Sequence, residues 1–276
     1  MTFLILVVFV LGLLIGSFLN CLIWRLHEDE TILGRSYCPS CHHQLAWYDN
    51  IPLLSYSFLG GKCRYCHKKI SIQYPAVELA TGLLFALAFW VEASAMAIVP
   101  AFGANPFNFI FSPFSLFLLK DWFIIAVMMV VFIYDLRWYM ILDKVTLPAM
   151  LVVIAFNLYF EFVLEYPLLT WRNWLISGII GCSFFLMQFV ATKGKGIGGG
   201  DLRLGLLMGL ALGLPKLFVA IMLAYLVGAI VGLSLMAAGK KEWGSKLPLG
   251  VFLAPATVFA LFYGEQIWQL LFPSIY

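Results

Sequence analysis

Charged residues are scarce in this sequence. Lys, Arg, Asp and Glu make up only 11% of its 276 residues, whereas 63% are hydrophobic and the mean hydropathy is +0.97. A soluble domain has about 25% charged and roughly 45–50% apolar residues. The shortage of charge excludes an ordinary soluble domain and predicts an all-α polytopic membrane protein.

Several familiar sequence signals are also missing. The chain has neither the G-x-S-x-G motif of serine hydrolases nor the H-E-x-x-H motif of zinc peptidases. No Lys or Arg precedes the apolar run at residues 3–24 and no A-x-A site follows it, so we expect a retained first span rather than a signal peptide. A G-x-G-x-x-G pattern occurs at 194–199, but the apolar run before it rules out the βαβ unit of a dinucleotide site.

Apolar stretches long enough to cross a bilayer, about 17–25 residues, recur along the chain. We expect about eight transmembrane helices, of which the sixth is short. The sixth and seventh are either two crossings or one helical hairpin that does not cross fully. The spans are expected near residues 3–24, 76–99, 116–134, 145–164, 174–190, 202–214, 216–238 and 247–272.

Basic residues are unevenly distributed among the expected loops. If the N-terminus faces outward, all but three of the 17 basic residues lie in inside loops. The exceptions are Lys120, Arg172 and Lys216. Because this asymmetry follows the positive-inside rule, it predicts that residues 26–75 and the regions of Asp135 and Asp201 face the cytoplasm. Both termini would then face outward.

Four of the six cysteines form two close pairs in the first long loop. Cys38 and Cys41 make one C-x-x-C motif, Cys63 and Cys66 make the other, and 21 residues separate the two motifs. Four thiolates at such spacing provide a tetrahedral site for one metal ion, most often Zn²⁺. A loop of about 50 residues has too small a core to fold by itself, which favours a structural zinc site.

Two alternatives to zinc remain open, namely a redox-active C-x-x-C pair or thiols without a ligand. Disulfides are disfavoured on the cytoplasmic side. The neighbouring His42, His43 and His67 are possible substitute ligands, but we expect them at the surface. Cys21 and Cys182 lie within expected spans and are interpreted as small apolar side chains.

A glycine-rich segment, residues 193–203, lies between two apolar runs and contains the carboxylate of Asp201. Glycine destabilises helices and permits bends or a close approach to a ligand. A carboxylate in a membrane helix is unfavourable, by about 2.5–3.5 kcal/mol at the bilayer centre, unless it has a partner or a function. Asp201 therefore either caps the following helix or takes part in chemistry.

A second carboxylate, Asp135, ends the apolar run of the third span at a similar depth. Two carboxylates from different helices that meet near the membrane surface can share one proton. One then acts as a base on water and the other as an acid on a peptide carbonyl. This is the chemistry of an aspartic protease. Asp143, eight residues further on, is the rival of Asp135 for the first catalytic position.

Together these motifs resemble the type IV prepilin peptidase family, also called leader peptidase/N-methyltransferase. Its members are intramembrane aspartyl proteases with a G-x-G-D signature, which Gly198-Gly199-Gly200-Asp201 matches. The resemblance covers nearly the whole chain. Its blocks lie at residues 16–25, in the cysteine module at 47–52, 61–63 and 74–78, at 135–148 and at 198–204.

The resemblance implies that Asp135 and Asp201 are the catalytic pair, supported by a loop that contains Gly198 and Gly200. It implies cleavage of prepilins or pseudopilins after the glycine that ends a short basic leader, on the cytoplasmic face of the bacterial inner membrane. The same enzymes then methylate the new N-terminal residue, usually Phe, from S-adenosylmethionine. These proteins serve type IV pili and type II secretion.

Within the resemblance, Gly61 and Lys62 match positions associated with methylation, and the four-cysteine loop marks the bifunctional bacterial members. We expect a first span at 1–25, a zinc-binding module at 26–75 and a protease core at 76–276. The expected partners are the substrate helix and membrane lipid, with no nucleic acid. The expected cofactors are structural zinc and S-adenosylmethionine.

A proton-coupled transporter that uses the two Asp residues as a relay is the alternative function. A transporter of this kind typically shows glycine or proline breaks in matching positions of two repeats. The sequence has one glycine break, and a zinc loop serves no evident purpose in transport. A non-catalytic scaffold with a zinc module would leave Asp135 and Asp201 without a role.

Overall fold

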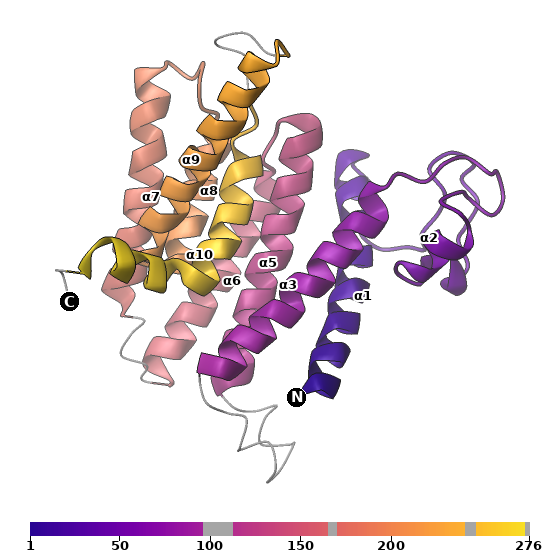
Figure 1. Ribbon diagram of the computed structural model, residues 1–276, viewed down its shortest axis with the longest axis horizontal. Helices are drawn as coiled ribbons and strands as arrows, with labels where there is room; N and C mark the ends of the chain where they lie inside the picture. Colours follow the sequence, from indigo (N-terminus) through magenta and orange to yellow (C-terminus); the bar gives the residue numbers. More distant parts are fainter. Residues whose placement is uncertain (96–112, 165–169, 241–246, 274–276) are drawn as a thin grey trace. The chain divides into compact units, whose positions relative to one another are not determined.

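The computed structural model describes residues 1–95, 113–164, 170–240 and 247–273. Within these ranges the regular secondary structure is helical, and strand-like pairing is limited to two isolated bridges, Tyr37 with Gln44 and Lys62 with Lys69. The helices run roughly side by side within each part of the chain (Figure 1). The predicted all-α membrane fold is thereby confirmed.

Among the described residues, seven helices are long and apolar enough to cross a membrane. They match seven of the eight expected spans. The remaining one, the sixth, corresponds to α8 (Gly199–Leu212), which has 14 residues. At 1.5 Å per residue α8 is about 21 Å long, less than the roughly 30 Å of a bilayer core. The seven long helices are α1 (Thr2–His27), α3 (Gln73–Ala95), α5 (Pro113–Trp138), α6 (Asp143–Phe162), α7 (Trp171–Ala191), α9 (Lys216–Ala237) and α10 (Gly250–Leu271).

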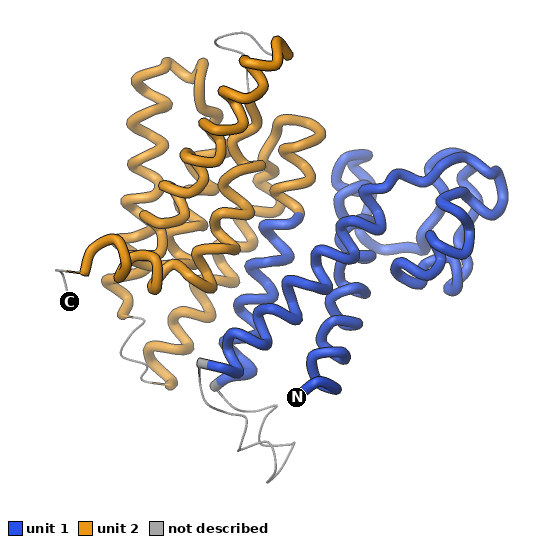
Figure 2. Tube along the Cα trace, viewed as in Figure 1, with its two compact units in different colours: residues 1–129 blue, residues 130–276 orange. Residues whose placement is uncertain are grey.

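The chain forms two compact units, residues 1–129 and 130–276 (Figure 2). Helix α5 begins in the first unit and ends in the second. The first unit also holds the loop between α1 and α3, in which two short helices form, η1 (Trp47–Asn50) and α2 (Leu54–Phe58). The finer division into parts at 1–25, 26–75 and 76–276 remains a prediction.

In the first unit, α1 and α3 pack closely through small residues. A Cβ atom on Gly12 would lie 2.7 Å from the Cα atom of Gly82, and one on Gly16 would lie 2.7 Å from the Cα atom of Glu78. Glycines four residues apart let two membrane helices approach until their backbones touch. The amide of Asn20 extends this contact toward the loop, because its Nδ2 donates to the Tyr74 carbonyl at 3.0 Å.

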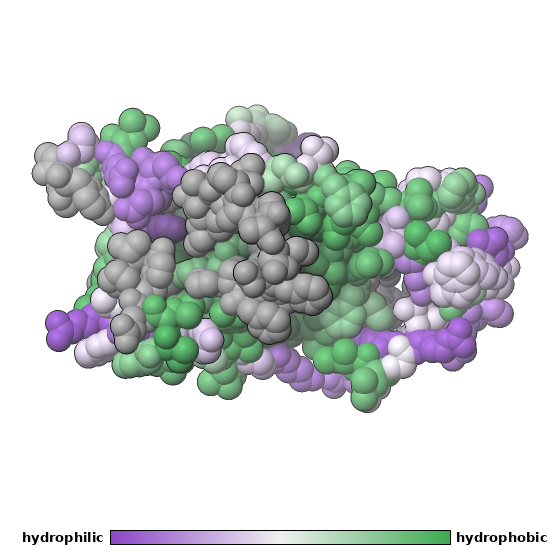
Figure 3. All heavy atoms as spheres, turned by 90° about the horizontal axis from the view of Figure 1, so that it is seen from below, coloured by the Kyte–Doolittle hydropathy of each residue, from purple (hydrophilic) through white to green (hydrophobic). Residues whose placement is uncertain are grey.

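In the second unit, α8 is the buried helix, and its residues from Leu204 to Leu212 are almost all enclosed. Gly181 of α7 and Gly205 of α8 leave no room for a side chain at their contact. The buried amide of Asn157 donates to the Leu210 carbonyl at 2.8 Å, which adds a polar tie across an apolar interface. By contrast, apolar residues such as Met187 of α7 are exposed, as lipid contact requires. Hydrophobic residues also cover much of the face drawn in Figure 3.

The end of α8 explains why the sixth span is short. Gly213 has φ +68°, a left-handed conformation that glycine adopts without strain. The side chain of Asn173 then brackets Leu214, accepting from its N–H at 2.6 Å and donating to its C=O at 3.1 Å. The chain therefore turns after residue 212 and continues into α9.

Replacing Gly209 by Ala should destabilise the second unit, because a Cβ atom there would lie 2.6 Å from the Cα atom of Gly178 and nearer still to the backbone of Ser177. Overpacking of this kind costs about 1–3 kcal/mol. Gly228→Ala is the matched control, since its nearest neighbour, a ring carbon of Phe252, would lie 3.4 Å away. Thermal unfolding in detergent should show a lower transition temperature for the first variant only. Equal transition temperatures would contradict this packing.

Candidate active site and metal centre

Asp201 lies in the first turn of α8, which begins at Gly199 within the glycine-rich segment. Its Oδ2 accepts a hydrogen bond from the backbone N–H of Gly198, the N-cap residue, at 2.9 Å. The negative charge also lies at the positive end of the helix dipole. The capping interpretation of Asp201 is thus confirmed, and it explains how a carboxylate that is only 9% exposed is tolerated there.

Asp135 lies in the last turn of α5, where the dipole of its own helix disfavours a negative charge. The start of α10 compensates for this. Asp135 Oδ2 accepts from the Val251 N–H at 3.2 Å, and the side chain is 5% exposed. Gly250 makes the approach possible, because a Cβ atom there would lie 2.8 Å from that oxygen.

The two carboxylates belong to the same unit, and the negative charge of Asp201 repels that of Asp135. Asp201 also interacts electrostatically with the phenol of Tyr225 on α9. The Tyr225 hydroxyl donates to Oε1 of Gln188 on α7 at 2.8 Å. Side chains of four helices, α5, α7, α8 and α9, therefore contribute polar groups to one region. The two acids there accept hydrogen bonds from backbone amides at the starts of α8 and α10 and can exchange protons with water or a peptide.

The glycines before Asp201 have distinct positions. Gly198 supplies the capping N–H, and Gly200 packs against the segment that follows Asp135. A Cβ atom on Gly200 would lie 2.8 Å from the Cβ atom of Ile141. Any larger residue at 200 would push apart the two segments that carry the carboxylates.

The rival carboxylate, Asp143, lies at the start of α6 and forms an ion pair with Arg203 of α8. Its side chain is 47% exposed, in contrast to the two buried acids. This pair connects the segment after Asp135 to the helix of Asp201. The arrangement gives Asp143 a structural partner outside the buried pair.

Sequence reasoning missed the contributions of Gly250 and Tyr225. Gly250 could have been found from its place at the start of an apolar helix that follows a basic loop. Its partner Asp135, however, lies more than a hundred residues away in the chain. Nothing in the local sequence distinguishes Tyr225 from other aromatic residues of a membrane helix.

In the first unit, the four cysteines of the loop come together. Their sulfur atoms all lie within 4.8 Å of one another. The two C-x-x-C motifs have the same local structure: the Cys38 N–H donates to the His43 carbonyl and the Cys63 N–H to the Lys68 carbonyl, at 3.0 and 2.9 Å. Both turns pass through an exposed histidine with φ +56°, His42 or His67.

These cysteines fit a metal ion. Tetrahedral Zn²⁺ with Zn–S bonds of about 2.3 Å places its sulfurs roughly 3.8 Å apart, and the Sγ atoms of Cys38 and Cys66 are 3.9 Å apart. The neighbouring histidines are exposed, as expected of side chains that are not ligands. A cluster of four thiols therefore offers a complete ligand set, and such sites without an open position are structural.

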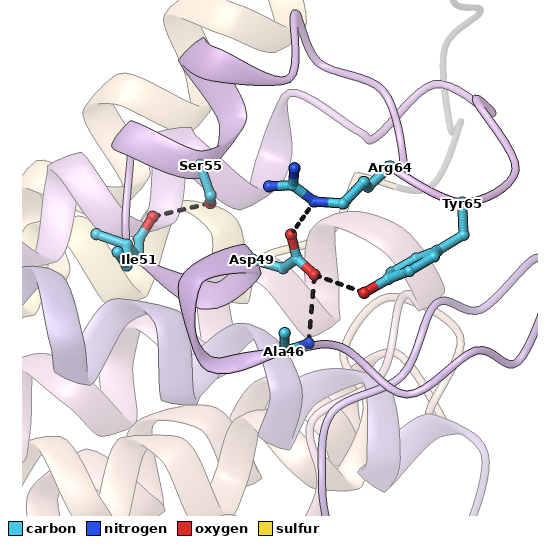
Figure 4. A network of polar contacts seen from close by, with 6 residues as sticks. All are labelled: Ala46, Asp49, Ile51, Ser55, Arg64 and Tyr65. Atoms are coloured by element: carbon cyan, nitrogen blue, oxygen red, sulfur yellow. Dashed lines mark hydrogen bonds and ion pairs between the residues drawn. The ribbon is translucent and has the colours of Figure 1, made fainter.

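A network around Asp49 holds the second cysteine motif to η1 (Figure 4). The Asp49 carboxylate accepts from Arg64 Nε at 2.7 Å, from the Tyr65 hydroxyl at 3.2 Å and from the Ala46 N–H at 3.2 Å. Burial acts to raise the pKa of Asp49, but the hydrogen bonds from these groups outweigh it and keep the pKa below its ordinary value. Asp49 is therefore ionised at neutral pH and stabilises the module there.

Gly61 and Lys62 lie immediately before the second cysteine motif. Gly61 has φ +68° and lies against Tyr56, whose hydroxyl oxygen would be 2.9 Å from a Cβ atom at position 61. Lys62 forms the isolated bridge with Lys69 and is exposed. The described residues include no sheet, so a Rossmann-type site for a methyl donor is not built from them.

Comparison with protein families gives two matches that together span most of the chain. The Bacterial Peptidase A24 N-terminal domain matches residues 10–92, which include most of α1, the cysteine module and most of α3. The Type IV leader peptidase family matches residues 122–233, which include both buried carboxylates. No solved structure matched the chain.

Curated relatives agree with these matches. A protein of Burkholderia pseudomallei (strain 1026b) is 30% identical, over 95% of this chain and 86% of its own length. One of Aeromonas hydrophila is 32% identical, over 95% and 92%. One of Myxococcus xanthus (strain DK1622) is 35% identical, over 84% and 63%. Each is named prepilin leader peptidase/N-methyltransferase. With near-complete coverage at this identity, the chain belongs to the type IV leader peptidase family.

Proposed function

We propose that this protein is an intramembrane aspartic endopeptidase that removes the leader from prepilins or pseudopilins and then N-methylates the new N-terminus. One observation carries the proposal. Two buried carboxylates, Asp135 and Asp201, are held by backbone amides at the starts of α10 and α8. Relatives that align over nearly the whole chain are named for both activities.

In the peptidase step, Asp135 and Asp201 share one proton. The ionised carboxylate takes a proton from a water molecule, while the oxygen of that water bonds to the carbonyl carbon of the scissile peptide. The protonated carboxyl gives its proton to the carbonyl oxygen. When the tetrahedral intermediate breaks its C–N bond, the carboxyl that took the proton from water gives it to the leaving nitrogen, and the other carboxylate takes a proton from a hydroxyl of the intermediate. The amine and carboxyl products then separate, and the pair, singly protonated throughout, is back in its starting state.

The surrounding residues suit this chemistry. The capping N–H groups of Gly198 and Val251 stabilise whichever carboxylate is ionised. The glycines at 198–200 leave the backbone beside Asp201 without side chains, so a peptide can approach it closely. Because repulsion between two neighbouring negative charges favours the singly protonated pair, one acid and one base are available together.

For the location, we propose the bacterial inner membrane with the active site at the cytoplasmic face. The support is the distribution of basic residues, which concentrates them in the loops next to Asp135, Asp201 and the cysteine module. A basic leader is kept on the same side by the same rule. We propose that both termini face outward. This orientation requires that α8, although shorter than the bilayer core, and the turn after it return the chain to the outer side before α9 begins.

For the second activity, we propose S-adenosylmethionine as the methyl donor, with Gly61 and Lys62 taking part in transfer. The donor would supply an electrophilic methyl group to the free N-terminal amine of the cleaved pilin, which would lose a proton, and S-adenosylhomocysteine would be the leaving group. The names of the relatives support this activity. We propose zinc as a structural ion bound by Cys38, Cys41, Cys63 and Cys66.

No observation favours the transporter alternative. Its relay needs a continuous polar path across the membrane. Asp135 and Asp201 instead lie where helices begin or end, as expected of a site that accepts a peptide from one side. The family to which the chain belongs is one of peptidases.

Replacing either Asp135 or Asp201 by Asn should abolish cleavage, because an amide can neither take a proton from water nor carry the shared proton. General acid–base catalysis contributes about 10²–10⁴-fold to the rate, so the cleavage rate of each variant should be at least about 100-fold lower than that of the wild type. The measurement is cleavage of a prepilin in liposomes, with mass spectrometry of the product N-terminus.

Asp143→Asn is the matched control for this experiment. Since Asp143 is half exposed and paired with Arg203, its loss should change the cleavage rate by no more than about twofold. Cleavage that survives in the Asp135 variant and disappears in the Asp143 variant would reverse the assignment. Cleavage that survives in all three variants would refute the aspartic mechanism.

Replacing Cys63 by Ser should release the metal ion, because it removes one of four thiolate ligands from a buried position. We expect about one zinc per wild-type chain and a small fraction of that in the variant, as measured by atomic absorption of the purified protein. Cys182→Ser, in α7, is the control and should keep its zinc. Equal zinc content in both variants would rule out the four-cysteine site.

A further inference from the structure

One buried carboxylate takes no part in the site described above. Glu78 lies near the start of α3 in the first unit and is 7% exposed. It faces α1, where the backbone of Gly16 lies against the backbone of Glu78. A buried carboxylate in a membrane helix is unfavourable unless its hydrogen bonds compensate for lost water. The hydrogen-bond partner of the Glu78 carboxylate therefore indicates its role.

That partner belongs to the loop. Glu78 Oε2 accepts a hydrogen bond from the Leu53 N–H at 2.9 Å. Leu53 has φ +60°, an unfavourable backbone conformation for a residue with a branched side chain. A conformation of that kind persists only when its surroundings enforce it. The charge-assisted bond from Glu78 is such a constraint, and it ties the loop to the membrane helix.

From Leu53 the constraint continues along the chain to Gly61. Leu53 is the N-cap of α2, which has only five residues and is too short to be stable alone. Tyr56 of α2 then holds Gly61 in two ways: its carbonyl accepts from the Gly61 N–H at 2.9 Å, and its ring covers the face where a Cβ atom would project. Gly61 in turn accepts from the Ile70 N–H at 2.8 Å.

We propose that Glu78 is a positioning residue for methyl transfer, which acts by anchoring Leu53 and thereby α2, Gly61 and Lys62. The inference rests on the proposed function, which assigns Gly61 and Lys62 to that reaction. Glu78 does not itself touch the reacting groups. It connects the helix pair α1 and α3 to the segment that precedes the second cysteine motif, so it sets where that segment lies relative to its own membrane helices.

Two substitutions separate the hydrogen bond from the charge. Glu78→Gln keeps an oxygen that accepts from the Leu53 N–H, whereas Glu78→Leu removes the acceptor at similar volume. Thr81→Val is the matched control, because Thr81 is fully buried one turn further along α3 and its hydroxyl donates to the Val77 carbonyl of its own helix. Each variant is tested as the full-length protein in liposomes.

Four quantities are measured: the rate of leader cleavage, the rate of methylation of pre-cleaved pilin, the zinc content, and hydrogen–deuterium exchange of residues 53–62. In Glu78→Leu, methylation should fall about tenfold or more, as expected when a buried N–H loses its acceptor. Exchange in the segment should become faster, while cleavage and zinc content stay at wild-type values. Glu78→Gln should restore methylation and slow exchange, and Thr81→Val should match the wild type throughout.

Three results would overturn the inference. One is wild-type methylation in Glu78→Leu. Another is a Glu78→Gln variant as impaired as Glu78→Leu, which would assign the effect to charge. The third is a joint loss of zinc, cleavage and methylation in Glu78→Leu, which would mean general unfolding. A wild-type protein that transfers no methyl group would instead refute the proposed second activity, so the two failures are distinguishable.

Discussion

Backbone amides at helix N-termini are what allow two carboxylates to remain buried in so apolar a chain. Asp201 uses the first turn of its own helix, α8, and its bond to the Gly198 N–H is local. Asp135 lies at the unfavourable C-terminal end of α5 and depends on α10, which begins at Gly250. Without these amides, each ionised acid would carry the full penalty of lost hydration. The second unit is therefore organised so that two helices begin where a third one ends.

The close packing of α8 follows from the same requirement. A short helix that starts with a functional carboxylate must be held at a fixed depth, and glycines at its contact with α7 permit this by bringing the two backbones together. Asn157 and Asn173 add hydrogen bonds to the carbonyls of Leu210 and Leu214. Since there is little difference in apolarity between lipid and side chains, such packing and polar ties are the main forces that position membrane helices.

Local sequence predicted what is local in the structure. Composition was enough for the all-α membrane fold, and the spacing of two C-x-x-C motifs was enough for the four-thiol cluster. The helix boundaries were less accurate: α5 runs from Pro113 to Trp138, a few residues beyond the expected span at each end, although Asp135 lies at the end of this helix as expected. The contacts of Asp135 with the start of α10 and of Asp143 with Arg203 join residues far apart in the chain. Such pairings depend on tertiary packing, which no periodicity or motif in the separate segments encodes.

The central claim is that Asp135 and Asp201 work as one acid–base pair with a single proton. The most direct test is the rate of prepilin cleavage by the wild-type protein in liposomes as a function of pH, with substrate well below saturation. A pair that is active only when singly protonated gives a bell-shaped profile, in which both limbs belong to the pair rather than to either residue. A profile with one limb and a plateau would contradict the claim, because a single titrating group would then be sufficient for catalysis.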